Sequence, residues 1–146
     1  MIRELTIKEV PLLIECAKSF WEEGRIPGRF NADCFVKGWT AFLEQRIGVI
    51  LVAEEQGEIV GGIGGSLFPD FNTGDLTATE MFWYLMPGHR GQGLRLLREF
   101  ERAMRERGGK RIWMVHLMAV NAERMAEYYA RNGYALSEQF FVKELN

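Results

Sequence analysis

Segment 78–86 constrains the fold more than any other part of the chain, because it is almost wholly apolar and runs directly into a glycine-rich turn. Its single ionisable residue is Glu80. A strand of this composition is typical of the middle of a sheet that is covered on both faces. The turn 87–93 reads Pro-Gly-His-Arg-Gly-Gln-Gly. We therefore expect a buried central strand that ends abruptly and leads into a helix.

Segment 92–107 predicts the most regular helix of the sequence. Its apolar residues recur at helical spacing and form one stripe: Leu94, Leu97, Phe100, Ala103 and Met104. Gly108 and Gly109 end the helix by offering left-handed backbone, and segment 111–118 returns as a strand. Strand, helix and strand form a crossover unit, which places the two strands parallel to each other.

The other segments complete one domain over residues 1–146. We expect strands at 2–5, 48–53, 58–65 and 134–145, helices at 7–24, 31–45 and 122–132, and a surface loop at 68–77. The glycines of the second hairpin strand indicate a close approach of backbones or a bulge. The order β-α-α-β-β-β-α-β-α-β predicts an α/β fold, a mixed sheet with helices on its faces.

The composition is that of an ordinary globular protein. The 18 basic and 20 acidic residues are scattered and give a net charge of −2, so no broad field is available to hold nucleic acid or an anionic membrane. Cys16 and Cys34 show no metal-ligand spacing, and we expect both to be buried free thiols in a reducing cytoplasm. The charged start of the chain and the lack of long apolar runs predict a soluble, unprocessed protein.

The turn before the long helix has the features of a phosphate-binding site. The first backbone N–H groups of a helix have no partners within the helix, and the helix dipole favours negative charge there. Gly91 and Gly93 carry no Cβ, so we expect unusual backbone dihedrals and a close approach to an anion, while Arg90 adds a positive charge. An ordinary tight turn into a helix is the alternative interpretation.

Segment 83–94 resembles the cofactor motif of the GNAT superfamily of N-acetyltransferases. In that motif a strand and a proline-containing loop lead through an Arg/Gln-x-x-Gly-x-Gly/Ala turn into a helix. Arg90 and Gly93 match the first and fourth positions of the turn. Arg95 stands at the sixth position, where the family normally has a small residue.

The end of the chain carries a second match to the same family. Residues 129–134 read Tyr-x-x-x-Gly-Tyr and resemble the family's Tyr-x-x-x-Gly-Phe, with Asn121 placed like an upstream asparagine but one residue further away. The order of elements also agrees over essentially the whole chain. The resemblance implies a mostly antiparallel central sheet, helices on both faces, and a splayed pair of parallel central strands.

The resemblance also implies an N-acetyltransferase, which transfers an acetyl group from acetyl-coenzyme A directly to an amine and needs no metal. The pantetheine arm is expected between the splayed strands. The cofactor-binding residues that it implies are Tyr84, Leu85, Met86, Arg90, Gly91, Gln92, Gly93, Leu94, Arg95 and Asn121. The expected partner is a small-molecule or protein amine, a homodimer is left open, and nucleic acid and membranes are not expected. A non-catalytic acyl-coenzyme A-binding module with the same fold is the alternative function.

Direct transfer requires a base that neutralises the amine and an acid that protonates the leaving thiolate. Glu80 is the candidate base, and a carboxylate that is merely paired or solvated at a strand end is its alternative. The resemblance implies Tyr129 as the acid. Tyr128 competes with it because Asn121 is shifted, and a core aromatic is the structural alternative. His116 is more typical of a structural histidine than of a base.

Acceptor selection is expected in two irregular segments, 20–30 and 68–77, which should border the acceptor side. Asp70 and Asp75 in the second segment are carboxylates of the kind that attract a cationic amine. The sequence does not specify the acceptor.

Overall fold

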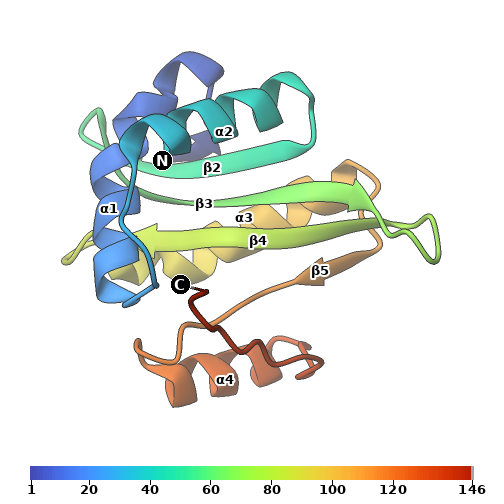
Figure 1. The fold of residues 1–146 in the computed structure, drawn as a ribbon. Helices are drawn as coiled ribbons and strands as arrows, with labels where there is room; N and C mark the ends of the chain where they lie inside the picture. Colours follow the sequence, from blue (N-terminus) through green and yellow to red (C-terminus); the bar gives the residue numbers. More distant parts are fainter. Residues whose placement is uncertain (146) are drawn as a thin grey trace.

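Five strands form one sheet in the order β1-β2-β3-β4-β5, in a computed structural model that describes residues 1–145. The strands are β1 (Ile2–Glu4), β2 (Gly48–Glu55), β3 (Glu58–Pro69), β4 (Leu76–Leu85) and β5 (Arg111–Trp113). The first four strands pair antiparallel, whereas β4 and β5 run parallel (Figure 1). The predicted mixed sheet, mostly antiparallel with one parallel pair, is confirmed.

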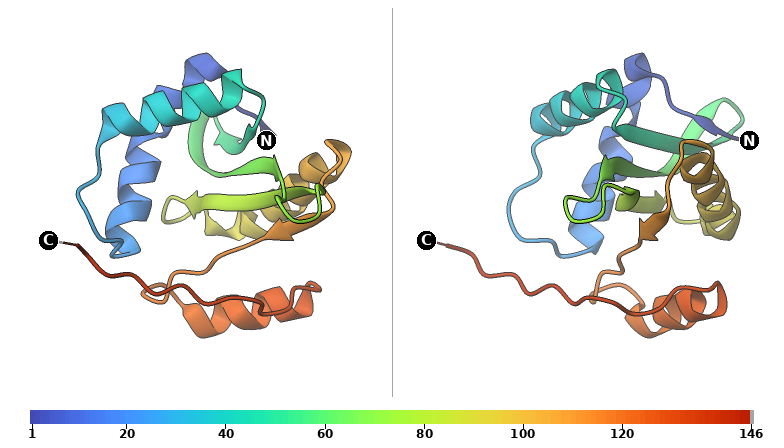
Figure 2. Two further views of the ribbon diagram at one scale, coloured as in Figure 1. Left: turned by 45° about the vertical axis from the view of Figure 1, so that its right-hand side comes forward. Right: turned by 90° about the vertical axis from the view of Figure 1, so that its right-hand side faces the viewer.

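Helices cover both faces of this sheet (Figure 2). They are η1 (Ile7–Leu13), α1 (Ile14–Glu23), α2 (Ala32–Glu44), η2 (Arg90–Gln92), α3 (Gly93–Glu106) and α4 (Ala122–Arg131). One core lies under α3 and includes Leu97 and Phe100, and the other lies under η1 and α2 and includes Leu13 and Trp39. No helix within residues 1–145 is both long enough and apolar enough to cross a membrane.

The first predicted helix is divided into two parts. Thr6 caps η1 through a reciprocal pair of hydrogen bonds with Glu9, which satisfies otherwise unpaired N–H groups. Pro11 cannot donate a backbone hydrogen bond and lies inside η1, so regular α-helix begins only at Ile14. The helix then ends before Gly24, as predicted.

A bulge between β3 and β4 changes which residues face the two cores. Gly64 pairs with Phe82 and Gly65 pairs with Glu80, so Met81 is an extra residue in β4. Alternation along a regular strand would place residues 78 and 82 on the same face. Instead, Ala78 packs in the core under α3 and Phe82 packs against Trp39. The prediction of a bulge or close approach is confirmed.

The glycines of β3 also meet the backbone of β4 closely. A Cβ on Gly65 would lie 2.4 Å from the carbonyl oxygen of Thr79, and one on Gly61 would lie 2.3 Å from that of Tyr84. Neither position has room for a side chain. These glycines let β3 and β4 pair closely on either side of the bulge.

Several sequence predictions about packing are wrong. Of the two cysteines, Cys16 is buried as predicted, whereas Cys34 is exposed in the first turn of α2. Leu96 takes the place of Leu94 in the buried stripe of α3, because Leu94 lies in the first turn of the helix and is 38% exposed. The predicted loop 68–77 is shorter, since β3 continues to Pro69 and β4 begins at Leu76.

The two strands predicted after α3 also differ from expectation. β5 ends at Trp113 rather than at residue 118, and segment 134–145 forms no strand. Its apolar pattern has strand propensity, but a strand needs a neighbouring edge, and this segment runs away from the sheet (Figure 2). Phe140 and Phe141 on it are strongly exposed.

Candidate active site

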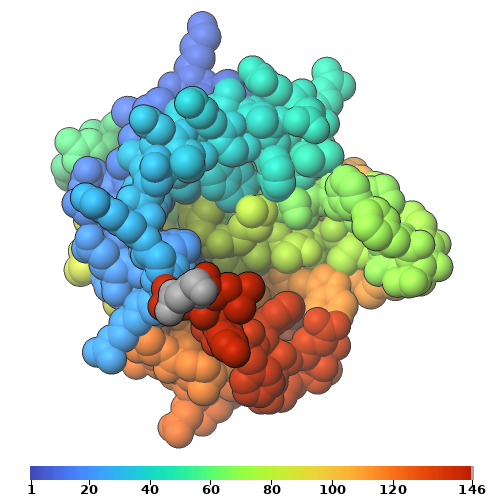
Figure 3. Space-filling model, viewed as in Figure 1, coloured from blue at the N-terminus to red at the C-terminus, as the bar shows by residue number. Residues whose placement is uncertain are grey.

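The parallel strands β4 and β5 separate after a short paired region, and this separation leaves a gap beside the end of β4. In the part of the chain that the structure describes, they pair between residues 77–79 and 111–113. The chain then leaves the sheet toward α4 (Figure 1). In the space-filling view, β4 lies at the bottom of a depression between α2 and α4 (Figure 3).

A cavity of about 500 Å³ lies where the two strands separate, bounded by α1, β4, the first turn of α3, and α4. It brings together eight of the predicted site residues: Glu80, Tyr84, Leu85, Arg90, Gly91, Gly93, Leu94 and Asn121. The strand, the turn and the last helix, which are far apart in the sequence, therefore meet at one cavity.

Four predicted site residues do not line this cavity. Met86 donates its backbone N–H to Val60 at 2.9 Å, and the amide of Gln92 is hydrogen-bonded to Glu55 of the hairpin. Arg95 is exposed on α3. Tyr129 is buried and donates its hydroxyl proton to the carbonyl oxygen of Val115 at 2.8 Å.

The glycine turn has a different backbone from the one expected. Gly93 is the first residue of α3 and has ordinary right-handed dihedrals, with φ −54° and ψ −46°. Gly88 has the left-handed backbone within the turn, with φ 88°. The prediction of unusual dihedrals is wrong for Gly93 and also for Gly91, which lies within η2 and has no left-handed backbone. A Cβ on Gly93 would stand 3.5 Å from Trp83 and 3.6 Å from Leu85, which are ordinary contact distances, so alanine would fit beside this wall of the cavity and only a larger side chain would narrow it.

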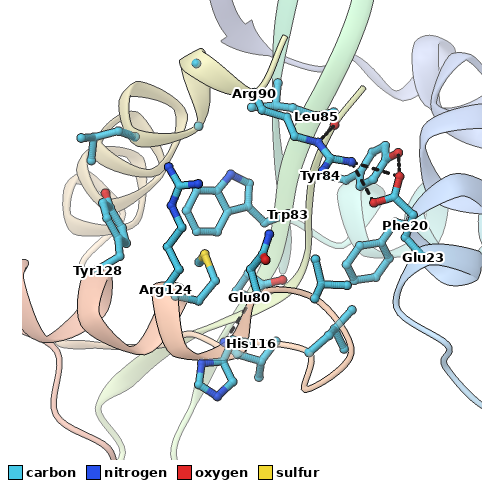
Figure 4. A pocket seen from close by; sticks show the side chains of 18 residues that line it. Phe20, Glu23, Glu80, Trp83, Tyr84, Leu85, Arg90, His116, Arg124 and Tyr128 are labelled. Atoms are coloured by element: carbon cyan, nitrogen blue, oxygen red, sulfur yellow. Dashed lines mark hydrogen bonds and ion pairs between the residues drawn. The ribbon is translucent and has the colours of Figure 1, made fainter. Parts of the chain in front are cut away.

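Arg90 lies across the cavity wall in this structure. Its guanidinium group forms an ion pair with Glu23 at 2.8 Å, and its Nε donates to the carbonyl oxygen of Leu85 at 3.3 Å. The same Glu23 carboxylate accepts a hydrogen bond from the Tyr84 hydroxyl at 2.6 Å (Figure 4). These hydrogen bonds lower the pKa of Glu23, so it is ionised at neutral pH.

Glu80 is the buried carboxyl group of the cavity. It is only 4% exposed, and its Oε2 accepts a hydrogen bond from the backbone N–H of Val115 at 3.2 Å. Burial raises the pKa of Glu80 from its ordinary 4.5 to about 8, against the smaller opposite effect of that hydrogen bond. At neutral pH the group is therefore poised to exchange a proton.

The two neighbouring tyrosines differ in what their hydroxyl groups contact. The Tyr128 hydroxyl is buried, and among the described residues it has no hydrogen-bond partner, although Tyr128 lines the cavity. Tyr129 packs edge-on against Tyr128 and stacks on His116, which also lines the cavity. Burial raises the pKa of both tyrosine hydroxyls, so both remain protonated at neutral pH.

Sequence reasoning missed several cavity residues. Phe20 and Glu23 lie in segment 20–30, where acceptor selection is expected, but no local motif distinguishes them there. Trp83, Arg124 and Met125 also line the cavity, and only the approach of α4 to β4 reveals them.

The second segment expected to select the acceptor contributes no lining residue to this cavity. Asp70 accepts hydrogen bonds from the backbone of its own turn, at 2.8 Å from Asn72 and 2.9 Å from Thr73. Asp75 pairs with Arg111 at 3.0 Å. Both carboxylates are thus engaged within or beside their loop.

Comparison with known proteins agrees with this arrangement. The family model described as the acetyltransferase (GNAT) family matches residues 13–134, so the chain belongs to the GNAT acetyltransferase family. A comparison with curated proteins found none that matches.

Solved structures with the same fold include several acetyltransferases. A predicted acetyltransferase with acetyl-coenzyme A from Clostridium acetobutylicum has a TM-score of 0.79 at 19% identity, covering 100% of this chain and 95% of its own. A ribosomal-protein-alanine N-acetyltransferase from Brucella melitensis biovar Abortus 2308 has a TM-score of 0.75 at 18% identity, covering 99% of both chains. An aminoglycoside acetyltransferase from an uncultured soil metagenomic sample has a TM-score of 0.76 at 21% identity, covering 100% and 98%. At these identities the likeness shows the fold.

The residues present fit acetyl-coenzyme A as a cosubstrate. Gly91, Gly93 and Leu94 place the first turn of α3 at one end of the cavity, where the helix dipole favours a negative charge, although the Gly93 N–H already donates to the carbonyl oxygen of Arg90. Arg90 and Arg124 add two cationic side chains for phosphate groups. Apolar side chains such as Trp83, Leu85 and Val115 line much of the remaining wall and suit a pantetheine arm. Within residues 1–145, no cluster of three or more His, Cys, Asp or Glu side chains is arranged to hold a metal ion.

Proposed function

We propose that the protein is an acetyl-coenzyme A-dependent N-acetyltransferase. The observation that carries this proposal is the position of Glu80, a buried carboxyl group that shares one cavity with the first turn of α3. A thioester whose diphosphate lies at that turn would extend along the gap between β4 and β5 toward Glu80. The acceptor amine then approaches from the side of α1.

In the proposed reaction, the acceptor first loses a proton, because an ammonium group has no lone pair for attack. Glu80 takes this proton directly or through one water, and its pKa of about 8 suits the exchange near neutral pH. The amine nitrogen attacks the thioester carbonyl carbon, and the tetrahedral intermediate collapses by breaking the C–S bond. The nitrogen releases its remaining extra proton to solvent water. The thiolate of coenzyme A gains a proton from a tyrosine hydroxyl, which solvent water then reprotonates.

The proton for the thiolate comes from one of the two neighbouring tyrosines. Tyr128 is favoured by its position on the cavity wall and by a hydroxyl proton that no described acceptor holds. Tyr129, which family resemblance implies, already donates its proton to Val115 and would have to break that bond. Adjacent residues of an α-helix lie about 100° apart around its axis, so the two hydroxyl groups point in different directions. Phenylalanine variants of both residues are needed to assign the role.

The proposal is tested by incubating the protein with acetyl-coenzyme A and an amine library while released thiol is detected. Glu80→Gln should lower kcat/KM at neutral pH by about 10²-fold, the scale of general base catalysis, and recover in part at higher pH, where more acceptor is neutral. Calorimetry with coenzyme A provides the second readout. Binding without turnover by any amine would instead identify a non-catalytic binding module, and no binding by folded protein would refute both functions.

A further inference from the structure

The ion pair between Arg90 and Glu23 indicates how this site selects its acceptor. Arg90 belongs to the turn that would hold the diphosphate, yet its guanidinium group lies against α1. The guanidinium group lies in a small enclosure formed by Glu23, Tyr84 and Phe20, which we call the box. The Glu23 carboxylate oxygens accept hydrogen bonds from Arg90 Nη2 at 2.8 and 3.0 Å, and the guanidinium carbon lies 5.7 Å from the centre of the Tyr84 ring. The ring of Phe20 meets Tyr84 edge-on and closes one side (Figure 4).

This box has the chemistry of a cation site. An ionised carboxylate and an aromatic face are the two groups that bind an ammonium or guanidinium ion most effectively. The Tyr84 hydroxyl fixes the carboxylate at 2.6 Å, so the site keeps its shape when the cation leaves. Phe20, Glu23 and Tyr84 line the same cavity as Glu80, which places the box and the proposed base around one space.

In the box, the Nε and Nη2 groups of Arg90 donate to Leu85 and Glu23, so a phosphate at the helix turn that takes these donors competes with both contacts. A diphosphate carries more charge than a single carboxylate and binds arginine strongly. It would therefore draw Arg90 away from Glu23. The carboxylate that remains is ionised, partly enclosed, and without its internal cation.

We propose that Glu23, Tyr84 and Phe20 form an acceptor subsite for a positive charge, which Arg90 fills until the diphosphate of coenzyme A withdraws it. The inference rests on the proposed acetyltransfer. It names the substrate class as amines with a second cationic group, such as diamines or aminoguanidines. The reacting amine lies at Glu80 while the second charge lies at Glu23, so the free site rejects the acceptor until the acetyl donor is bound.

A matched substrate series tests the substrate class. Each linear diamine from three to eight carbons is compared with the monoamine in which a methyl group replaces the second ammonium. At its best length, the diamine should have about tenfold higher kcat/KM than its matched monoamine. Glu23→Gln should bring this ratio close to one. Glu22→Gln, a change at the adjacent exposed carboxylate of α1, is the control and should keep the wild-type ratio.

A binding experiment tests the exchange of Arg90 without any turnover. Calorimetry measures the affinity of the preferred diamine in the presence of saturating coenzyme A or saturating pantetheine, which lacks the diphosphate. Coenzyme A should raise diamine affinity about tenfold over pantetheine, because the two ligands are coupled through Arg90. Arg90→Gln should let the diamine bind the protein alone.

The outcomes separate this inference from the function on which it rests. Acetylation of monoamines with no diamine preference at any length would overturn the cation subsite and leave the acetyltransferase intact. Equal diamine affinity with coenzyme A and pantetheine would overturn the exchange of Arg90. A folded protein that binds no coenzyme A would refute the proposed function and this inference together.

Discussion

Replacing Glu80 by glutamine should stabilise the protein, and the gain should grow with pH. Glu80 is buried and its pKa is raised from 4.5 to about 8. Between these two values the unfolded chain releases the Glu80 proton while the native protein retains it. The free energy of unfolding therefore falls as pH rises through this window.

The size of the effect follows from the pKa values. Each pKa unit corresponds to about 1.4 kcal/mol, so ionisation of Glu80 costs the native state about 5 kcal/mol once the pH exceeds 8 and about 3 kcal/mol at pH 7. The cost is absent below pH 4.5, where the carboxyl group is protonated in both states. Glutamine has nearly the same shape, does not ionise, and can still accept the hydrogen bond from Val115.

Urea unfolding at pH 5, 6, 7 and 8 measures this difference. The difference in free energy of unfolding between Glu80→Gln and wild type should rise by about 1.4 kcal/mol per pH unit and level off near pH 8. Glu22→Gln is the control, because this exposed carboxylate should show no such trend. Parallel stability profiles for wild type and Glu80→Gln would refute the burial argument and with it the assignment of Glu80 as a base near neutral pH.

The remaining predictions concern the cofactor turn and the proton donor. Gly93→Val should lower coenzyme A affinity at least tenfold by calorimetry, because its γ-methyl groups project into the cavity beyond a Cβ that already contacts Trp83 and Leu85. Gly93→Ala is the control that should bind more tightly than the valine variant, and equal affinity for both would place the phosphate elsewhere. Tyr128→Phe should lower turnover about 10²-fold while coenzyme A affinity changes little, and Tyr129→Phe should retain more activity. A larger loss of turnover in Tyr129→Phe than in Tyr128→Phe would assign the proton donor to Tyr129.

The sequence predicted the arrangement around the long helix well, because the signals there are local. The apolar segment with Glu80, the turn at Arg90 and Gly93, and the amphipathic helix all depend on residues near one another in the chain. Left-handed backbone at Gly108 ended the helix as expected. The one error in the buried stripe of the helix was at its start, where the sequence predicted Leu94 to be buried and the structure buries Leu96 instead.

The end of the chain was predicted less well, because strands need a partner that the sequence does not name. Segment 134–145 has the composition of a strand, yet it pairs with no other segment within the described residues, and β5 ends after three residues. Strand formation depends on hydrogen bonds to a neighbour, whereas helix formation is satisfied within one segment.

The sequence by itself determined the family and the mixed sheet, and it located the glycine turn to which the proposed function assigns the phosphate. The tertiary structure alone decided the electrostatics of the site. Glu80 has a raised pKa because the fold buries it beside Val115, a residue 35 positions further along the chain. Likewise, Glu23 and Arg90 are 67 residues apart in sequence and become an ion pair only when α1 packs against β4. Burial and charge pairing depend on distances through space, and these arise when distant segments fold together.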